Sequence, residues 1–185
     1  MCDAWGANTV YFVVAAVTNR PFTCATPTMK VHYEMIDKES DLTLAAPCGL
    51  YCGNCPIFRT YFDRDMIKAA NLAKSFECKP EQVRCSGCRT SPQFRWSADC
   101  EFQKCTEDKG IKFCYECDGF PCDKIKSFAE SAPHHKAIWA NFERIKTVGW
   151  RQWAAEQDEK WRCGVCRAKL DYYDEACPTC GIGVS

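Results

Sequence analysis

The stretch APCGLYCGNCPIF, residues 46–58, decides how this chain folds. It holds three cysteines, with three residues between Cys48 and Cys52 and two between Cys52 and Cys55. Cysteines at such short spacings can turn their sulfur atoms toward one metal ion. Pro56 follows directly and suits the first position of a helix, because proline lacks the N–H that would be unpaired there. The stretch therefore predicts a metal-binding turn followed by a helix.

Helices are expected on both sides of a segment that shows little periodicity. From Phe58 to Phe76, apolar residues recur every three or four positions, which indicates one amphipathic helix of roughly five turns. Further helices are expected between Cys122 and Pro133, over residues 134–146 and over residues 150–161, with Gly149 as the break between the last two. Residues 78–113 have too little apolar periodicity for a conventional core, so we expect metal ligation to hold them.

The cysteine content points to metal rather than to disulfide bonds. The chain of 185 residues has 17 cysteines, and because this number is odd at least one thiol would stay unpaired. The apolar stretch at residues 10–17 is too short to span a bilayer and has no positively charged segment before it. We therefore expect a cytoplasmic protein with reduced thiols and no membrane association. Cys-x-x-Cys pairs occur at Cys52/Cys55, Cys85/Cys88, Cys114/Cys117, Cys163/Cys166 and Cys177/Cys180.

The C-terminal stretch CGVCRAKLDYYDEACPTCG, residues 163–181, has the plan of a zinc ribbon. Two Cys-x-x-Cys knuckles are separated by ten residues, and LDYY and ACPTCG are expected to form the arms of a connecting hairpin. Four sulfur atoms would close a tetrahedron around zinc at about 2.3 Å, which makes the site structural rather than catalytic. Iron could occupy the same four-thiolate cage. The predicted ligands are Cys163, Cys166, Cys177 and Cys180.

Eleven cysteines fall between residues 48 and 122, and no histidine does. An all-sulfur ligand set favours zinc or an iron–sulfur cluster. Our preferred partition assigns one ion to Cys52, Cys55, Cys85 and Cys88. A second ion would take Cys100, Cys105, Cys114 and Cys117, with Cys122 as a competing ligand. With the C-terminal site this makes about three zinc ions. The alternative is a [4Fe–4S] cluster near Cys48, Cys52 and Cys55.

Other chemistry has little support in the sequence. There is no nucleophile motif with a neighbouring base, no phosphate-binding glycine loop and no dinucleotide fingerprint, so an enzyme is not the leading expectation. Formal net charge is zero, and metal-bound thiolates would make the protein more negative. That charge disfavours nucleic-acid binding, which calls for a basic face. We expect a metal-binding scaffold for a protein partner, with an iron–sulfur redox or cluster-carrier protein, or a nucleic-acid-binding zinc-ribbon protein, as the alternatives.

Several motifs together resemble a known family. PCGLYCGNCPIF, CSGCR and KGIKFCYECDGFPCDKI, in this order, are similar to an uncharacterised cysteine-rich family of prokaryotic proteins, a domain of unknown function. WRCGVCRAKLDYYDEACPTCG is similar to the zinc-ribbon ending of some members. The resemblance covers roughly residues 47–181 and implies metal binding with no established activity. It also implies that all the core cysteines named above, Cys48 and Cys122 included, belong to the family's pattern.

These observations predict an α+β fold of low strand content, in which a metal-stabilised cysteine-rich core packs with three or four helices and is followed by a C-terminal zinc ribbon. The expected divisions are an N-terminal extension or linker (1–46), a cysteine-rich metal-binding domain (47–130), a helical connector (131–160) and the ribbon (161–185).

Overall fold

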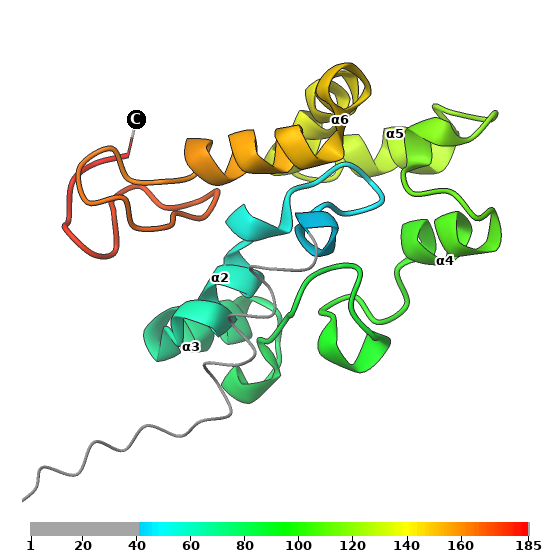
Figure 1. Ribbon diagram of the computed structural model, residues 1–185. Coiled ribbons are helices and arrows are strands. Elements are labelled where there is room, and N and C mark those ends of the chain that lie inside the picture. Colours follow the sequence, from blue (N-terminus) through cyan, green and yellow to red (C-terminus); the bar gives the residue numbers. More distant parts are fainter. Residues whose placement is uncertain (1–40, 185) are drawn as a thin grey trace, which may run out of the picture.

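The computed structural model describes residues 41–184, and this part of the chain is mostly helical (Figure 1). Residues 1–40, which hold most of the expected N-terminal extension, lie outside the described residues. No helix of the described part is both long and apolar enough to cross a membrane. The helices are α2 (Pro56–Asp63), α3 (Met66–Ser75), α4 (Glu101–Asp108), α5 (Asp123–Glu130) and α6 (Ile138–Lys160).

Extended structure is sparse among residues 41–184. It amounts to three isolated antiparallel bridges, which pair Ala45 with Tyr51, Arg162 with Lys169, and Ala176 with Gly183. The low strand content expected from the sequence is therefore confirmed, whereas the β part of the expected α+β class is reduced to these bridges. Short 3₁₀ turns connect the helices, at Asp41–Leu44, Cys52–Asn54, Pro80–Gln82, Pro92–Phe94, Cys114–Glu116 and Pro133–Ala137.

The single helix predicted from Phe58 to Phe76 is in fact two helices. Arg64 adopts a left-handed conformation with φ of 57°, which ends α2. The Asp65 side chain then accepts a hydrogen bond from the Lys68 backbone N–H (2.8 Å) and so caps α3. Aspartate is among the best N-cap residues and a poor residue for a helix interior, which explains the break. The apolar period runs across it, so periodicity alone does not reveal it.

The break predicted at Gly149 is confirmed. This glycine has φ of 79° and ψ of 157° inside α6, and the two halves of the helix run in different directions (Figure 1). Both halves face the main core, which receives Phe142 from the first half and Trp153 from the second. A break at this position therefore lets one chain segment cover two sides of the same core.

The main hydrophobic core joins α6 to the cysteine-rich turns. Phe142 and Trp153 pack with Tyr51 from the opening motif and with Phe102 and Phe113 from the irregular segment. A smaller cluster lies between α2, α3 and the following loop, and its buried members are Ile57, Ala69, Ala73, Val83 and Cys85.

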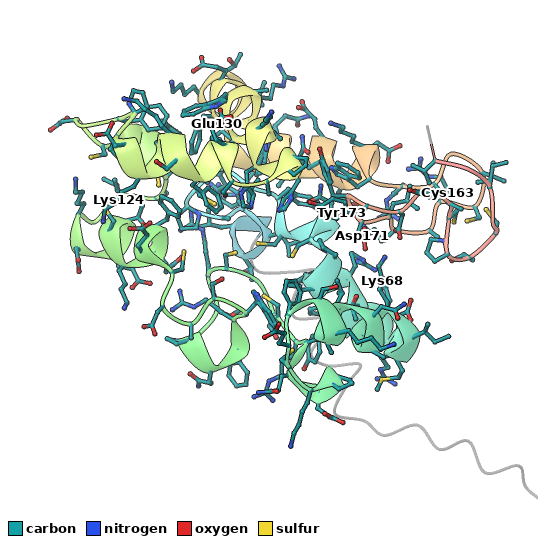
Figure 2. The ribbon with its side chains drawn as sticks, turned by 180° about the vertical axis from the view of Figure 1, so that it is seen from behind. Lys68, Lys124, Glu130, Cys163, Asp171 and Tyr173 are labelled. Carbon is teal, nitrogen blue, oxygen red and sulfur yellow. The ribbon has the colours of Figure 1, made fainter. Side chains whose placement is uncertain are left out.

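The C-terminal module, residues 161–184, has a minimal core of its own. Its buried apolar residues are Cys163, Leu170 and Cys177, so apolar burial contributes little to holding it. The module docks on the rest of the chain through the Tyr172 N–H, which donates to the Asn54 carbonyl (3.0 Å). Lys68 of α3 faces Asp171 of the module (Figure 2).

Candidate metal centre

The four C-terminal thiols converge on one point. The sulfur atoms of Cys163 and Cys180 lie 3.6 Å apart, those of Cys166 and Cys177 lie 3.5 Å apart, and all four fall within 4.8 Å of one another. These distances are too long for a disulfide bond, which is about 2.05 Å. They are close to the edge of about 3.8 Å that a tetrahedron with zinc–sulfur bonds of about 2.3 Å would have. The four thiols could therefore hold a metal ion.

The two knuckles repeat the same backbone pattern. The Cys163 N–H donates to the Ala168 carbonyl and the Cys177 N–H to the Ile182 carbonyl, both at 2.8 Å. Tight turns close each knuckle, since the N–H groups at Arg167 and Gly181 donate back to the carbonyls of the first cysteine of each (3.0 and 2.9 Å). Both turn residues have positive φ, of 63° and 74°. Each knuckle is thus a small hairpin closed on itself by its own bridge.

This pattern corrects one expectation about the module. LDYY and ACPTCG were expected to be the paired arms of one hairpin, but the bridges join Arg162 to Lys169 and Ala176 to Gly183, each across a single knuckle. The reason is local. A Cys-x-x-Cys turn with a left-handed residue after it reverses the chain at once, so each knuckle finds its hydrogen-bond partners within a few residues.

Backbone N–H groups lower the pKa of the two buried thiols of the module, Cys163 and Cys177. Hydrogen bonds from the N–H groups of Cys166 and Val165 lower the pKa of Cys163 to about 6. The Val165 N–H lies 3.4 Å from the sulfur. Hydrogen bonds from the backbone of Cys180 and Thr179 likewise lower the pKa of Cys177. Because metals bind the thiolate, these donors favour the ligand form of both side chains.

The core thiols predicted to share the first ion lie near one another, although less tightly. The Cys88 N–H donates to the Cys52 sulfur (3.4 Å), which joins the two knuckles. The Gly87 N–H donates to the Cys85 sulfur at 3.4 Å, the same contact that Val165 makes with Cys163. Burial raises the pKa of Cys55 to about 12, and the neighbouring thiols of Cys88 and Cys85 also raise it.

The remaining core thiols gather around Cys114. Burial raises the pKa of Cys114 to about 12, and four neighbouring thiols contribute in the same direction. These neighbours are Cys105, Cys122, Cys100 and Cys117, which are the other residues of the second predicted set together with the competing ligand. Among residues 41–184, the four C-terminal cysteines are the set of potential ligands whose sulfur atoms all lie within 4.8 Å of one another. The core thiols of this range do not meet this criterion.

Cys48 interacts electrostatically with thiols of both predicted core sets. Burial raises its pKa, and the thiols that influence it most are Cys88, Cys100 and Cys114. Cysteines from later in the chain therefore raise the pKa of the first cysteine of the opening triplet. Cys78 packs beside the α2–α3 cluster. The fifteen cysteines of the described part are all free thiols.

Two cations near the thiols were not predicted from the sequence. The Lys109 ammonium donates to the Cys117 sulfur at 2.9 Å. Arg89 donates through Nε to the Ala45 carbonyl (2.7 Å). Burial lowers the pKa of Arg89, and the neighbouring thiols of Cys52 and Cys88 act in the opposite direction. No spacing rule marks these residues as neighbours of thiols, and only the position of Arg89 directly after Cys88 was a signal in the sequence.

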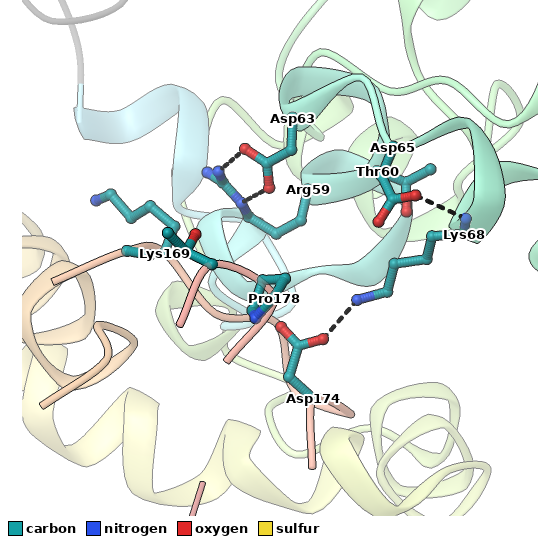
Figure 3. Close-up of a pocket in the computed structure, with 10 residues that line it drawn as sticks. Arg59, Thr60, Asp63, Asp65, Lys68, Lys169, Asp174 and Pro178 are labelled. Atoms are coloured by element: carbon teal, nitrogen blue, oxygen red, sulfur yellow. Dashed lines mark hydrogen bonds and ion pairs between the residues drawn. The ribbon is translucent and has the colours of Figure 1, made fainter. Parts of the chain in front are cut away.

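A polar cleft of about 480 Å³ separates α2 and α3 from the C-terminal module (Figure 3). On α2 Arg59 pairs with Asp63, while Lys169 of the module pairs with Asp158 of α6, which lies outside the cleft lining. Lys68 of α3 crosses the cleft to Asp174 (2.6 Å). The cleft walls therefore serve to hold the module against the helices.

Residues 44–127 match a protein family described as "Protein of unknown function (DUF3795)". The match confirms the resemblance seen in the sequence for this region, which includes every core cysteine from Cys48 to Cys122. The four C-terminal thiols lie beyond it. No curated protein and no solved structure matches the chain.

Proposed function

We propose that this chain is a zinc-binding protein in which metal ions organise a scaffold for a protein partner, without catalysis. The observation that carries the proposal is the convergence of the four C-terminal sulfur atoms at separations of 3.5 and 3.6 Å in opposed pairs. Zinc is favoured because the site is all sulfur and offers four ligands, the usual set for structural zinc.

The small apolar core of the C-terminal module supports a structural role for the ion. The apolar core of the module consists of only three buried residues, Cys163, Leu170 and Cys177, two of which are proposed ligands. In such small units metal binding supplies folding free energy, about 10–16 kcal/mol apparent for zinc-finger peptides at neutral pH. The proposal includes a reducing, cytoplasmic setting, since the thiolate ligands must stay unoxidised.

A second structural ion is proposed at Cys52, Cys55, Cys85 and Cys88. Its support is the N–H to sulfur contact at Cys85, which repeats the contact at Cys163, together with the contact between Cys88 and Cys52. Arg89 would offset part of the negative charge that four thiolates leave on a divalent ion.

A protein partner is favoured over nucleic acid by the surface of the module. Val165 and Ile182, one beside each knuckle, are 71% and 49% exposed, which suits contact with an apolar protein surface. The cations of the module are meanwhile paired with carboxylates of α6. Arg162 and Lys169 pair with Asp158, and Arg167 pairs with Glu159. The surface of the module therefore has little positive potential to attract the phosphates of a nucleic acid.

The test is elemental analysis with a visible spectrum, on protein purified without oxygen and without added metal. The expected result is colourless protein that contains zinc. Iron with sulfide and visible absorption would instead support the iron–sulfur alternative, and protein that binds no metal would overturn the proposal. Partner capture should then depend on the module, so that Val165→Asp weakens it while Ile67→Asp on α3, at a side chain that is 79% exposed, serves as the substitution control.

A further inference from the structure

The four thiols of the C-terminal module differ in their access to solvent. Cys163 and Cys177 are each 2% exposed, whereas Cys166 and Cys180 are exposed. Each knuckle therefore has one sheltered and one accessible sulfur atom. The module lies at one end of the described chain, where its loops extend beyond the helices (Figure 1). A small reagent in the solvent can reach the accessible sulfur atoms there.

The sulfur atoms also face one another across the two knuckles. Cys163 lies 3.6 Å from Cys180, and Cys166 lies 3.5 Å from Cys177, so each of these pairs joins a buried thiol to an exposed one. A disulfide has about 2.05 Å between its sulfur atoms, so that closing either pair takes a movement of about 1.5 Å. Because all four cysteines belong to the module, this movement requires no rearrangement of the helices.

Backbone contacts keep the buried sulfur atoms in place. The Val165 N–H lies 3.4 Å from the Cys163 sulfur, and the turns closed at Arg167 and Gly181 hold each knuckle in shape. The two buried cysteines are also part of the small apolar core of the module. A change in the bonding of these sulfur atoms therefore acts on the part of the module that holds it together.

We propose that the four-thiol site is a modification site for hydrogen peroxide, which closes one disulfide between Cys163 and Cys180 and another between Cys166 and Cys177. This regulation rests on the zinc-binding function proposed above. A sulfur atom in a disulfide is no longer a thiolate, and the thiolate is the form that binds metal. Oxidation therefore removes the ligands of the ion, and reduction restores them.

Each disulfide forms in two balanced steps. The accessible Cys166 thiolate attacks one oxygen of the peroxide, so that a sulfur–oxygen bond forms, the oxygen–oxygen bond breaks and hydroxide leaves. The Cys177 thiolate then attacks the Cys166 sulfur, so that the disulfide forms, the sulfur–oxygen bond breaks and a second hydroxide leaves. Two electrons pass from the two sulfur atoms to one peroxide molecule. Cys180 and Cys163 react in the same way with a second peroxide molecule.

The test uses the fact that trypsin separates the knuckles. It cuts after Arg162, Arg167 and Lys169, which leaves Cys163 and Cys166 on one peptide and Cys177 and Cys180 on another. The full chain is loaded with zinc and treated with hydrogen peroxide, and its remaining thiols are blocked with N-ethylmaleimide. The digest is then analysed by mass spectrometry without reduction, beside the zinc content before and after oxidation.

The expected result is that the two peptides are joined by two disulfides and carry no blocked thiol. One zinc ion per chain should leave with this change and bind again after reduction with dithiothreitol. Retained zinc, with all four thiols unoxidised, would overturn the modification site and leave the zinc scaffold standing. Joined peptides from a chain that never bound zinc would overturn the scaffold alone, and a chain with neither zinc nor joined peptides would overturn both.

The Cys180→Ser variant assigns the pairs. It leaves Cys163 without its opposed sulfur atom, so the joined peptides should carry one blocked thiol, at Cys163. Cys78→Ser, outside the module, should give the parent result. A blocked thiol at Cys166 or Cys177 would contradict the proposed pairing, as would disulfides closed within each peptide. Should Cys180→Ser misfold by circular dichroism, fragmentation of the joined parent peptides locates the same two bonds.

Discussion

Lys68 of α3 forms an ion pair with Asp171, whose side chain is fully buried in the C-terminal module. The same ammonium reaches Asp174 at 2.6 Å, and the Tyr173 N–H donates to the other oxygen of Asp171 at 2.8 Å. The pair joins the region that matches the family to the segment beyond it. A buried carboxylate without a countercharge is costly, so Lys68 fixes where the module docks.

The Lys68→Met variant should therefore destabilise the protein. Breaking a buried pair costs about 3–5 kcal/mol, and because Lys68 is 28% exposed we expect about 2–3 kcal/mol. Denaturant unfolding of the metal-loaded protein measures the loss. Lys124→Met is the matched control, because its pair with Glu101 is exposed on both sides and should be worth less than about 1 kcal/mol. Equal effects of the two substitutions would show that the buried pair does not hold the module.

Gly49 in the opening motif should not tolerate a side chain. A Cβ there would lie 2.7 Å from the Phe142 ring, and φ is +83°. We expect Gly49→Ala to cost about 3 kcal/mol, from backbone strain and overpacking together. Gly110→Ala is the control, since φ is +64° but nothing lies within 4 Å, and strain alone should cost about 1 kcal/mol. Thermal unfolding of both variants checks the difference, and similar melting temperatures would contradict it.

The Cys163→Ser variant should lose one metal ion per chain and loosen the module. Backbone hydrogen bonds favour the thiolate of Cys163, whereas a serine hydroxyl stays protonated at neutral pH and is a poor ligand for a thiophilic ion. Elemental analysis measures the ion, and hydrogen exchange should show lost protection at Leu170 while Phe142 in the main core stays protected. Cys78→Ser should keep the parent metal content. Unchanged zinc in Cys163→Ser would exclude the four-thiol site.

Acid should destabilise the protein through His134. Burial, with a smaller effect of His135, lowers the pKa of His134 to about 4 from its ordinary 6.5. The unfolded chain then binds this proton near pH 6.5 and the folded chain only near pH 4, so stability falls as the pH drops through this interval. The hydrogen bond between the His134 ring and the Tyr173 hydroxyl (2.7 Å) should weaken with protonation.

NMR titration of the His134 ring measures its pKa directly, and a midpoint near 6.5 would contradict this prediction. His134→Gln should flatten the pH dependence of unfolding between pH 6.5 and 4. Zinc content is measured at each pH, because loss of metal in acid would otherwise add to the slope.

Where local rules apply, the sequence predicted the structure well. Gly149 breaks α6 because its positive φ needs glycine, and Pro56 begins α2 because proline suits a first helical position. The C-terminal site was predicted because Cys-x-x-Cys spacing places two sulfur atoms on one side of a tight turn. The break at Arg64 was missed, since the capping of α3 by Asp65 leaves the apolar period intact.

The sequence by itself thus determined the helical periods, the knuckles and the chemistry of their thiols. Only the tertiary structure decided which distant segments meet. Cys88 reaches Cys52, Lys109 reaches Cys117, and Lys68 reaches Asp171 through the packing of helices and turns that no spacing rule encodes. The physical reason is that backbone geometry sets distances within a few residues, whereas contacts between remote residues depend on how the whole chain buries its apolar surface around α6.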